Sequence, residues 1–535
     1  MGMAVNVRGA DREQLYLMPP SVTDWLPEDH LGWFVLDVVA ELDLAAFYAE
    51  FRVDGRGGAV YDPAMMLGVL VYAYATGERS SRRIERRLTE DVAYRVLAAN
   101  QRPDHATLAR FRRRHQAAIA ALFGQVLGLC VKAGLVDTGV VAIDGTKMMA
   151  DASFFANRKR EDLAAEILAE AEAVDAAEDE MFGDRRGDEL PAEWAGGRGR
   201  RERIRAALAE LDRQTARDYE TRMVERAAKE AATGRKTRGP KPSPEAARRS
   251  KPRRANTTDP HSRIIANASK GVIQGYNAQA AATANQIVVA AEVTATTNDQ
   301  PHFVPVATAV IENLADAGWD EPVGTLLADA GYWSVANSTA DVGAANVLIA
   351  TRKSAWRTAD KPDDDKLAVL ARVNRGELSQ RAAGDLLGVS YTWVRDMTKR
   401  YFGKEGQRIT RTAQPEPDEW IPVIERLDRG EISRRGACDE LQVSDTRAKS
   451  MLAHVRGEAI DPSIARQNMD AKLAEPANAE LYKQRGHTIE PVFGNIKANL
   501  GYRRFTRRSF DAVQSEWRLI CTAHNLLKLH QVGIA

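Results

Sequence analysis

The spacing of hydrophobic and polar residues changes along the chain, and each change predicts a different kind of segment. Over residues 1–130, apolar positions such as Met66, Val69 and Leu70 recur at helical spacing, which predicts a helical N-terminal domain. Short β-branched runs over 264–294 then predict strands. The alternating α/β pattern continues with a helix at about 301–316 and a strand at 346–350.

Two apolar runs in this α/β segment each end on a single aspartate. Residues 140–143 precede Asp144, and residues 326–328 precede Asp329. Neither run alternates between apolar and polar positions, which predicts strands that are buried on both faces. Taken alone, Asp144 followed by Gly145 also suits a hairpin turn, and Asp329 also suits a cap at a strand end.

A third acid, Glu490, lies in a predicted amphipathic helix near the C-terminus. Because proline is tolerated in the first turn of a helix, Pro491 places Glu490 at the predicted helix N-terminus, where the helix dipole favours a carboxylate. Lys497, two turns later, is expected on a neighbouring face. A lone glutamate on a helix is usually solvated, so only the combination of the acids carries weight.

Together, Asp144, Asp329 and Glu490 form a candidate catalytic site. Three isolated carboxylates on rigid supports are what a pair of divalent cations, roughly 3.5–4 Å apart, requires. We therefore expect the three acids to bind two ions of Mg²⁺ or Mn²⁺ per active site. No Ser/His/Asp or Cys/His set competes with them, which suits a reaction without a protein nucleophile.

An internal repeat interrupts the α/β pattern within residues 361–455. Residues 372–379 recur as residues 426–433, at a spacing of about 54 residues, so the module is duplicated. In each copy a helix, a Val-Ser turn and a second, basic helix predict a helix-turn-helix, whose second helix enters the major groove of DNA. Helix pairs with a purely structural role are the alternative. The expected DNA contacts on the second helices are Trp393, Arg395, Arg447 and Lys449.

Charge is informative only locally, because Lys and Arg (75) balance Asp and Glu (74) to a net charge of +1. Basic residues cluster at 79–87 and in the proline-containing linker 233–255, where they suit a phosphate backbone; a solvated surface is the alternative. A third basic run, 501–508, interleaves Arg503 and Arg504 with aromatic residues. This run is expected to form a nucleic-acid surface.

Cysteine usage and hydropathy restrict the compartment. Cys130, Cys438 and Cys521 are widely separated, which excludes a disulfide framework and a cysteine zinc site. No apolar run approaches about 18 residues, and the N-terminus lacks a basic region followed by an apolar core. We therefore expect a soluble protein of the cytoplasm without membrane contact.

Four residues near the C-terminus carry a resemblance to a known family. Tyr482, Arg485, Glu490 and Lys497 resemble the tyrosine–arginine–glutamate–lysine signature of bacterial insertion-sequence DDE transposases. Several upstream blocks are similar to the same group, and so is the helical N-terminal region. These blocks are residues 61–63, 142–147, 256–260, 275–280 and 329–332.

The resemblance implies an α/β fold with an RNase-H-like catalytic core. Its mixed sheet would carry Asp144 on the first strand and Asp329 on the neighbouring fourth, with Glu490 on a packed helix. The tandem helix-turn-helix module is an insertion into this pattern. The expected domains are a helical domain at 1–130 for DNA binding or dimerisation, the first part of the core at 136–357 with a helical and basic insertion at 156–255, the tandem insertion at 358–460, and the C-terminal core helices at 461–535.

The implied activity is metal-dependent cleavage of DNA at transposon ends, followed by strand transfer into target DNA. The implied partners are the terminal inverted repeats, target DNA and a second copy of the chain in a paired-end complex associated with the nucleoid. Lys497, Arg485 and Tyr482 are expected to hold phosphates beside the scissile bond. Two alternatives remain open: a domesticated DNA-binding regulator whose acids no longer cut, and an RNase-H-like nuclease without strand transfer.

Overall fold

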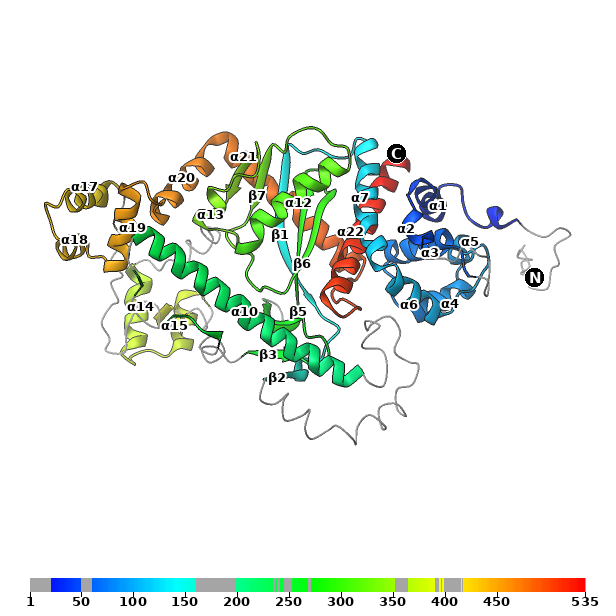
Figure 1. Cartoon of the computed structure of the whole chain (residues 1–535), viewed down its shortest axis with the longest axis horizontal. Coiled ribbons are helices and arrows are strands. Elements are labelled where there is room, and N and C mark those ends of the chain that lie inside the picture. The colour runs from blue at the N-terminus through cyan, green and yellow to red at the C-terminus, as the bar shows by residue number, and fades with distance from the viewer. Residues whose placement is uncertain are drawn as a thin grey trace, which may run out of the picture. The chain divides into compact units, whose positions relative to one another are not determined.

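The computed structural model describes most of the chain as two compact units (Figure 1). Unit 1 comprises residues 1–326, 342–346 and 483–535, and unit 2 comprises residues 327–341 and 347–482. The described residues are 21–49, 60–159, 199–351 and 364–534, with internal gaps at 234–235, 238–240, 245–252, 268–270, 390–393, 396, 399–414 and 416. Most of the predicted basic linker 233–255 therefore lies outside the described residues.

The helical N-terminal region is confirmed. Its helices are α1 (Leu31–Glu41), α2 (Ala45–Tyr48), α3 (Pro63–Ala75), α4 (Ser81–Glu90), α5 (Val92–Leu97), α6 (His105–Arg114) and α7 (Gln116–Lys132). Helix α3 starts at a proline, is capped by Asp62 and is buried along nearly its whole length. Helix α7 lies beside the long C-terminal helix α22 (Phe510–Ile534), which joins the two ends of the chain in one core (Figure 1).

Among the residues that the structure describes, no single helix is long and apolar enough to cross a membrane. Helices α6 and α7 would meet the length and composition only as a pair, and they are bent by 73° against each other.

A six-stranded sheet forms the centre of the α/β segment, as predicted. Strand β5 (Gly271–Thr283) pairs antiparallel with β1 (Val140–Met149) along one edge. Along its other edge it pairs with β4 (Arg263–Asn267) and then with β6 (Val288–Thr294), also antiparallel. The sheet continues from β1 to β7 (Thr325–Ala328) and β8 (Asn346–Ile349).

Strands β7 and β8 run parallel to each other. Asn346 N donates to Gly324 O at 2.8 Å, and Ala350 N donates to Ala328 O at 3.3 Å, so the register advances in the same direction on both strands. The boundary between the units falls inside β7, after Leu326. All four residues of β7 are buried, as predicted from their apolar run.

Helices cover this sheet and provide the core. Helix α12 (Phe303–Asp316) packs on β5 and β6, and α22 packs on β6 and on α3 (Figure 1). Trp517 on α22 is fully buried and donates its indole N–H to Gln279 O at 2.9 Å. The buried apolar residues of α22 therefore belong to the core.

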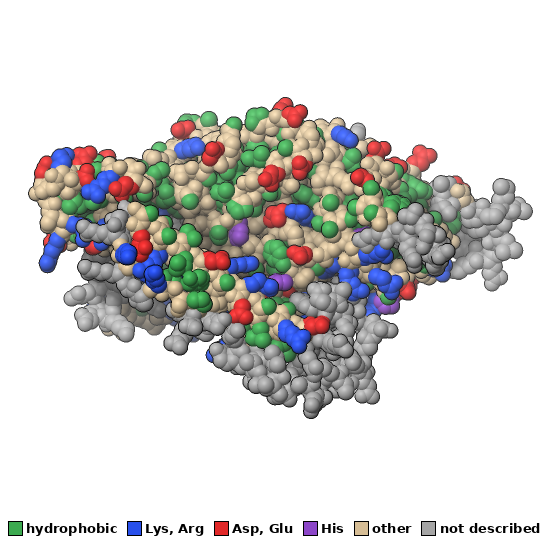
Figure 2. Space-filling model, viewed as in Figure 1, with side chains coloured by type: hydrophobic (Ala, Val, Ile, Leu, Met, Phe, Trp, Pro, Cys, Tyr) green, Lys and Arg blue, Asp and Glu red, His purple; other side chains and the backbone are tan. Residues whose placement is uncertain are grey.

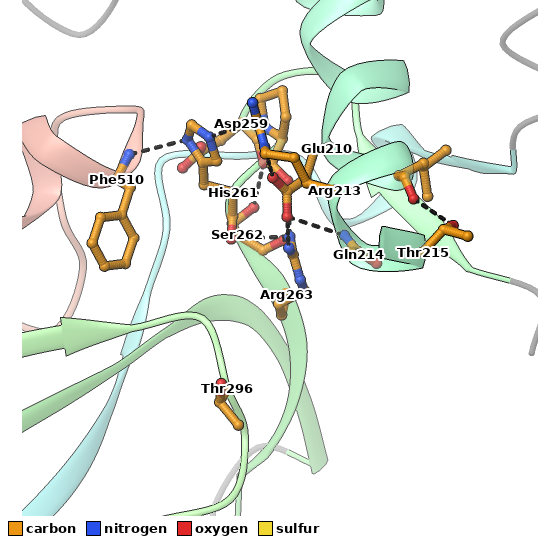
Figure 3. A network of polar contacts seen from close by, with 12 residues as sticks. Glu210, Arg213, Gln214, Thr215, Asp259, His261, Ser262, Arg263, Thr296 and Phe510 are labelled. Atoms are coloured by element: carbon orange, nitrogen blue, oxygen red, sulfur yellow. Dashed lines mark hydrogen bonds and ion pairs between the residues drawn. The ribbon is translucent and has the colours of Figure 1, made fainter. Parts of the chain in front are cut away.

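The 35-residue helix α10 (Gly199–Thr233) docks on the sheet through a buried ion-pair network (Figure 3). Glu210 is 3% exposed and accepts hydrogen bonds from Arg263 of β4 and, at 2.9 Å, from Arg213. Burial alone would raise the pKa of Glu210. The charge of Arg263 and the hydrogen bonds that Glu210 accepts from Arg213 and Gln214 instead hold this pKa below its ordinary value. His261 accepts from Phe510 N at 3.1 Å, which links the same site to the start of α22.

Unit 2 contains the duplicated module as two groups of helices, of which the structure describes two helices in the first and three in the second. The second group consists of α17 (Pro417–Asp428), α18 (Arg434–Leu441) and α19 (Asp445–Val455), packed around a core that includes Trp420, Ile424, Ala437 and Ala448. In the first group α14 (Asp364–Asn374) and α15 (Gln380–Leu387) pack around Leu370, Ala383 and Val394. Three of these core positions correspond between the groups at the spacing of the repeat: Leu370 with Ile424, Ala383 with Ala437, and Val394 with Ala448.

The ends of the paired helices also correspond. Gly388 follows α15 with φ +65°, and Gln442 follows α18 with φ +53°, so both helices end in a left-handed residue as the repeat predicts. Ser444 then caps α19 by accepting from Arg447 N. Unit 2 is completed by α13 (Val335–Ser338), which packs on α20 (Pro462–Ala474), and by the first residues of α21 (Pro476–Gly494).

Candidate active site

Asp144 lies in the middle of β1 and not at the end of a strand. Strand β1 continues to Met149, and Asp144 is opposite Ala280 of β5. The strand-end prediction and the hairpin-turn alternative are both wrong, because the polar residues after Asp144 keep an extended partner in β5. Asp144 accepts a hydrogen bond from Gly145 N at 2.7 Å, and its side chain is 22% exposed.

Glu490 lies near the C-terminal end of α21 and not at its N-terminus. The helix begins at Pro476 and runs through Pro491, because the defect that a proline causes is repaired from outside the helix. Proline has no N–H to donate to the carbonyl of His487 four residues earlier, and Gln286 Nε2 donates to that oxygen instead, at 3.1 Å. Five residues of π-helix, Asn495–Asn499, then follow. The predicted support of Glu490 by the helix dipole is therefore absent.

Arg485 brings Asp144 and Glu490 together within unit 1. Its Nη1 lies 3.3 Å from Asp144 Oδ2, and its Nη2 lies 3.6 Å from Glu490 Oε1. The guanidinium is 19% exposed, whereas Glu490 is 65% exposed. Two acids that are far apart in the sequence thus share one cation on a partly shielded surface.

Asp329 directly follows β7, as predicted, and belongs to unit 2. Its Oδ1 accepts from Gly331 N at 2.7 Å, which forms a tight turn after the strand. Tyr482 donates its hydroxyl to Ala328 O at 3.0 Å and so contacts the residue before this aspartate. Over the described residues, no group of three His, Cys, Asp or Glu side chains is arranged to hold a metal ion, and Asp329 is not placed relative to the acids of unit 1.

Lys497 reaches β1 from the π-helical segment. Its ammonium donates to Thr146 Oγ1 and, at 3.1 Å, to Lys147 O. Asp144 and Thr146 are two residues apart on β1, so their side chains lie on the same face of the strand. Lys497, which donates to Thr146, therefore lies on the side of the sheet that carries Asp144. Burial lowers the pKa of Lys497, and the nearby cations Arg503 and Lys147 lower it further.

A polar cluster behind Asp144 carries no prediction from the sequence. Asp299 Oδ1 accepts from Lys147 Nζ at 2.9 Å, from Asn277 Nδ2 at 2.6 Å and from Gln279 Nε2 at 3.0 Å. A Cβ at Gly145 would lie 2.6 Å from that oxygen, so only glycine fits there. Burial opposes the charge of Asp299, but these three donors hold its pKa below the ordinary value. The Asn-x-Gln pattern at 277–279 was the available signal.

Residues 256–260, one of the blocks that resemble the transposases, connect strands of the fold. Asp259 is completely buried and accepts from the Tyr276 hydroxyl at 2.8 Å, and Asn256 accepts from the main-chain N–H of Asp259 at 3.1 Å. Burial raises the pKa of Asp259 to about 6. The block therefore joins β3 (Arg254–Asn256) to β4 beneath the sheet, away from Asp144.

The basic run 501–508 does not present aromatic residues to solvent. Tyr502 and Phe505 are completely buried, and the Tyr502 hydroxyl donates to Tyr74 O at 2.8 Å. The predicted interleaved nucleic-acid surface is wrong in this respect, because Tyr502 stacks on Tyr74 of α3 and Phe505 packs against Tyr276 of β5 and Trp517 of α22. Arg503 and Arg504 are exposed, and their DNA contacts stay a prediction.

The predicted DNA contacts of the tandem module have different surroundings. Trp393 lies outside the described residues, and Arg395 is exposed. Arg447 forms a bidentate pair with the fully buried Asp461, at 2.5 and 2.8 Å. Lys449 pairs with Asp445 at 2.5 Å. None of these geometries tests DNA binding.

Opposite charges alternate on the surface of the second three-helix group (Figure 2). Four of its arginines are paired with acids of the same group. The ion pairs are Arg426–Glu440 at 3.0 Å, Arg429–Glu431 at 2.6 Å, Arg434–Asp445 at 2.5 Å and Arg456–Asp428 at 2.7 Å.

Comparison with known families assigns two parts of the chain. Residues 20–114 match a transposase domain family (DUF772), and residues 434–530 match a transposase DDE domain family. Both matches support an insertion-sequence DDE transposase. No curated protein and no solved structure matches it.

The two matched domains support a transposase function, that of a DNA-processing enzyme. The second matched segment contains Arg485, Glu490 and Lys497, which cluster around β1 in the structure. Asp144 and Asp329 lie outside both matched segments. The assignment of these two aspartates to the transposase site therefore depends on their positions in the fold.

Proposed function

We propose that this transposase cleaves DNA at the ends of its element and joins the freed ends to target DNA, with Asp144, Asp329 and Glu490 as its metal-binding acids. The observation that carries the proposal is the cation shared by Asp144 and Glu490, the guanidinium of Arg485. The two carboxylates carry two negative charges, and the guanidinium balances only one of them. Carboxylate oxygens are also the preferred ligands of Mg²⁺ and Mn²⁺.

The fold supports the same site. The strand order β6-β5-β1-β7-β8, with antiparallel strands followed by a parallel pair, is the arrangement expected of an RNase-H-like core. In this core Asp144 lies on the central strand, and Asp329 follows the next strand. Divalent cations held by the three acids supply Lewis acidity to an attacking hydroxyl and stabilise the leaving oxygen.

The remaining side chains of the site bind and orient DNA. Lys497 presents an ammonium beside the Asp144 face of β1, where it attracts a phosphate and fixes it against Thr146. Arg485 neutralises the charge of Asp144 and Glu490 when no phosphate is bound. When a phosphate binds, the guanidinium can donate hydrogen bonds to its oxygens. Tyr482 holds the end of β7 through Ala328 O, so it orients the start of the turn that carries Asp329.

The proposal includes recognition of the element's ends by the tandem module and by exposed arginines. Trp393, Arg395, Arg447 and Lys449 would provide contacts on the second helices of a tandem helix-turn-helix, and Arg503 and Arg504 would provide contacts near the core. The observation in favour is the correspondence of cores and helix ends between the two copies. We further propose that two copies of the chain pair the two ends.

Cleavage of labelled DNA that carries the element's own termini tests the proposal. Asp144→Asn, Asp329→Asn and Glu490→Gln should each abolish Mg²⁺-dependent cleavage while DNA binding persists. Glu312→Gln, at an exposed position on α12, is the matched control and should cleave normally. Normal cleavage by any of the three site variants would contradict the assignment, and cleavage without joining to target DNA would identify a nuclease instead.

Metal binding can be measured without DNA. Mn²⁺ at about 100 times its Kd should stabilise the wild-type chain by about 2.7 kcal/mol, which raises its Tm. Asp144→Asn should lose this increase, and Glu312→Gln should retain it. An equal increase in all three proteins would place the metal elsewhere.

A further inference from the structure

A cavity of about 530 Å³ with both polar and apolar walls lies on the flank of the helix that carries Glu490. Its walls come from the end of α21, the π-helical segment, the turn between β5 and β6, and the C-terminal part of α22. Gln286, Asn495, Asn499 and Gln531 contribute amides, and Lys528 contributes an ammonium. No acidic residue lines the cavity, although the chain as a whole has nearly as many acids as bases.

The cavity lies where α21 passes into the π-helical segment. Pro491 lines it, and the π-helical residues Asn495–Asn499 widen the helix at the point where the side-chain amides enter it. Gln286, in the turn, adopts a left-handed conformation with φ +64°. A non-glycine residue in this region is uncommon, and here the conformation allows both its side chain and its carbonyl oxygen to take part in the wall.

Directed hydrogen bonds fix the wall. His524 donates Nε2–H to Gln286 O at 2.9 Å, since a carbonyl oxygen can only accept. The other ring nitrogen, Nδ1, accepts from Asn495 Nδ2 at 3.1 Å, and Asn495 Oδ1 accepts from Asn499 Nδ2 at 3.0 Å. Burial lowers the pKa of His524 to about 4, which agrees with this neutral ring. The amides are therefore held in defined orientations.

The cavity keeps donors for a ligand. The ammonium of Lys528 donates to Gln286 Oε1 at 2.7 Å, and an ammonium has three donors in total. Asn499 is exposed and uses one amide proton toward Asn495, which leaves its carbonyl oxygen and a second proton facing outward. Gln531, three residues after Lys528 on α22, is exposed beside it.

Gly494 connects the cavity with Glu490. It lies one helical turn after Glu490 on the same side of α21 and also lines the cavity. A Cβ at Gly494 would meet nothing within 4 Å, so there is open space at this position, which we call the passage.

We propose that this cavity binds one nucleotide of a single DNA strand beside the scissile phosphate, with Lys528 at its phosphate and the amides of Asn499 and Gln531 at its base and sugar. Absence of acids and the single ammonium suit a phosphodiester, and amides both donate to and accept from base edges. The volume lies within the roughly 300–1,000 Å³ range of small-ligand sites, which suits a nucleotide and excludes a duplex. The inference rests on the proposed function, because it places the nucleotide next to the Glu490 site.

Binding of fluorescein-labelled oligothymidine, measured without divalent cations, tests the proposal. Lys528→Gln retains an amide donor for Gln286 and should reduce the slope of log affinity against log salt by about 0.7, the contribution of one phosphate contact on a single strand. Lys132→Gln, on the exposed face of α7, should leave the slope unchanged.

Filling the passage gives a second test that does not alter charge. Gly494→Leu should weaken oligothymidine binding by about tenfold, comparable to the loss of one stacked base. Gly494→Ala is the matched control and should bind normally; both substitutions favour the helix, because Gly494 has ordinary helical φ and ψ of −59° and −50°. Unchanged affinity in Gly494→Leu, or an unchanged salt slope in Lys528→Gln, would overturn the proposal.

These outcomes separate the cavity from the catalytic assignment. If the wild-type chain cleaves its element's ends and the cavity variants bind oligothymidine normally, the cavity proposal alone fails. If the wild-type chain does not cleave while the cavity variants lose binding, the proposed function fails and the nucleotide site stands.

Discussion

The side-chain amide of Gln286 donates to the main-chain oxygen of His487, the oxygen that Pro491 leaves without a helical donor. A residue in the turn between two strands thus allows α21 to continue past a proline and to carry Glu490 in its interior. The position of Glu490 therefore depends on a contact between segments that are about two hundred residues apart in the chain.

Removing this contact should matter only while the proline is present. Gln286→Ala should reduce the free energy of unfolding by about 1 kcal/mol, because the His487 oxygen loses its partner. In a Pro491→Ala background the helix supplies its own N–H, so the same substitution should cost clearly less. Chemical denaturation of the four proteins of this double-mutant cycle measures the difference. Equal costs in both backgrounds would show that the amide has another role.

Asp299 should matter for cleavage although it lies behind the site. Asp299→Ala removes an acceptor for Lys147, Asn277 and Gln279 and should cost about 2 kcal/mol of stability. It should also reduce the cleavage rate, because the strand at Gly145 then loses its support next to Asp144. Asp299→Asn keeps one acceptor and should recover part of the rate. Glu312→Ala serves as the control, and a stability loss without any loss of cleavage would limit Asp299 to the fold.

Asp259 should make stability depend on pH. Its pKa is raised from 3.8 to about 6, above all by burial, so the folded state binds more protons than the unfolded state between these values. The contribution of Asp259 to the free energy of unfolding should therefore decrease as the pH rises from about 4 to about 6, by about 3 kcal/mol in total. Above that range it should not change further. Asp259→Asn retains a carbonyl for Ser509 N and should remove this part of the dependence. Parallel Tm curves for the two proteins across this pH range would contradict the raised pKa.

Arg447 provides a test between a DNA contact and a structural contact. Arg447→Ala would leave the carboxylate of Asp461 buried without its cation, and we expect a loss of about 3 kcal/mol in the unfolding of unit 2. In an Asp461→Asn background the same substitution should cost much less. A protein whose stability is unchanged by Arg447→Ala but whose affinity for the element's ends falls would assign the residue to DNA instead.

Residues with a local signal were predictable from the sequence. The buried run before Asp329 ends on it as expected, and the left-handed ends of α15 and α18 follow from Gly388 and from its counterpart in the repeat. Glu490 was misplaced because the rule for proline treats a helix in isolation, and the donor that repairs the defect comes from Gln286.

The same limit explains the other differences. Whether β1 stops at Asp144 depends on its partner β5, and hydropathy alone does not reveal that Asn277 and Gln279 provide polar neighbours for the strand. The aromatic residues of 501–508 look suited to nucleic acid in the sequence, but Tyr74 from the N-terminal region covers Tyr502. In each of these cases the outcome depends on packing between segments that are far apart in the sequence.

The duplicated module has a genetic consequence. Each group of helices buries its own apolar residues, Leu370, Ala383 and Val394 in the first and Ile424, Ala437 and Ala448 in the second. Unequal crossing-over between the two copies would keep the reading frame and delete or add one whole repeat. The product would still contain complete groups, each with its core intact. The number of such groups can therefore change between related elements in single steps.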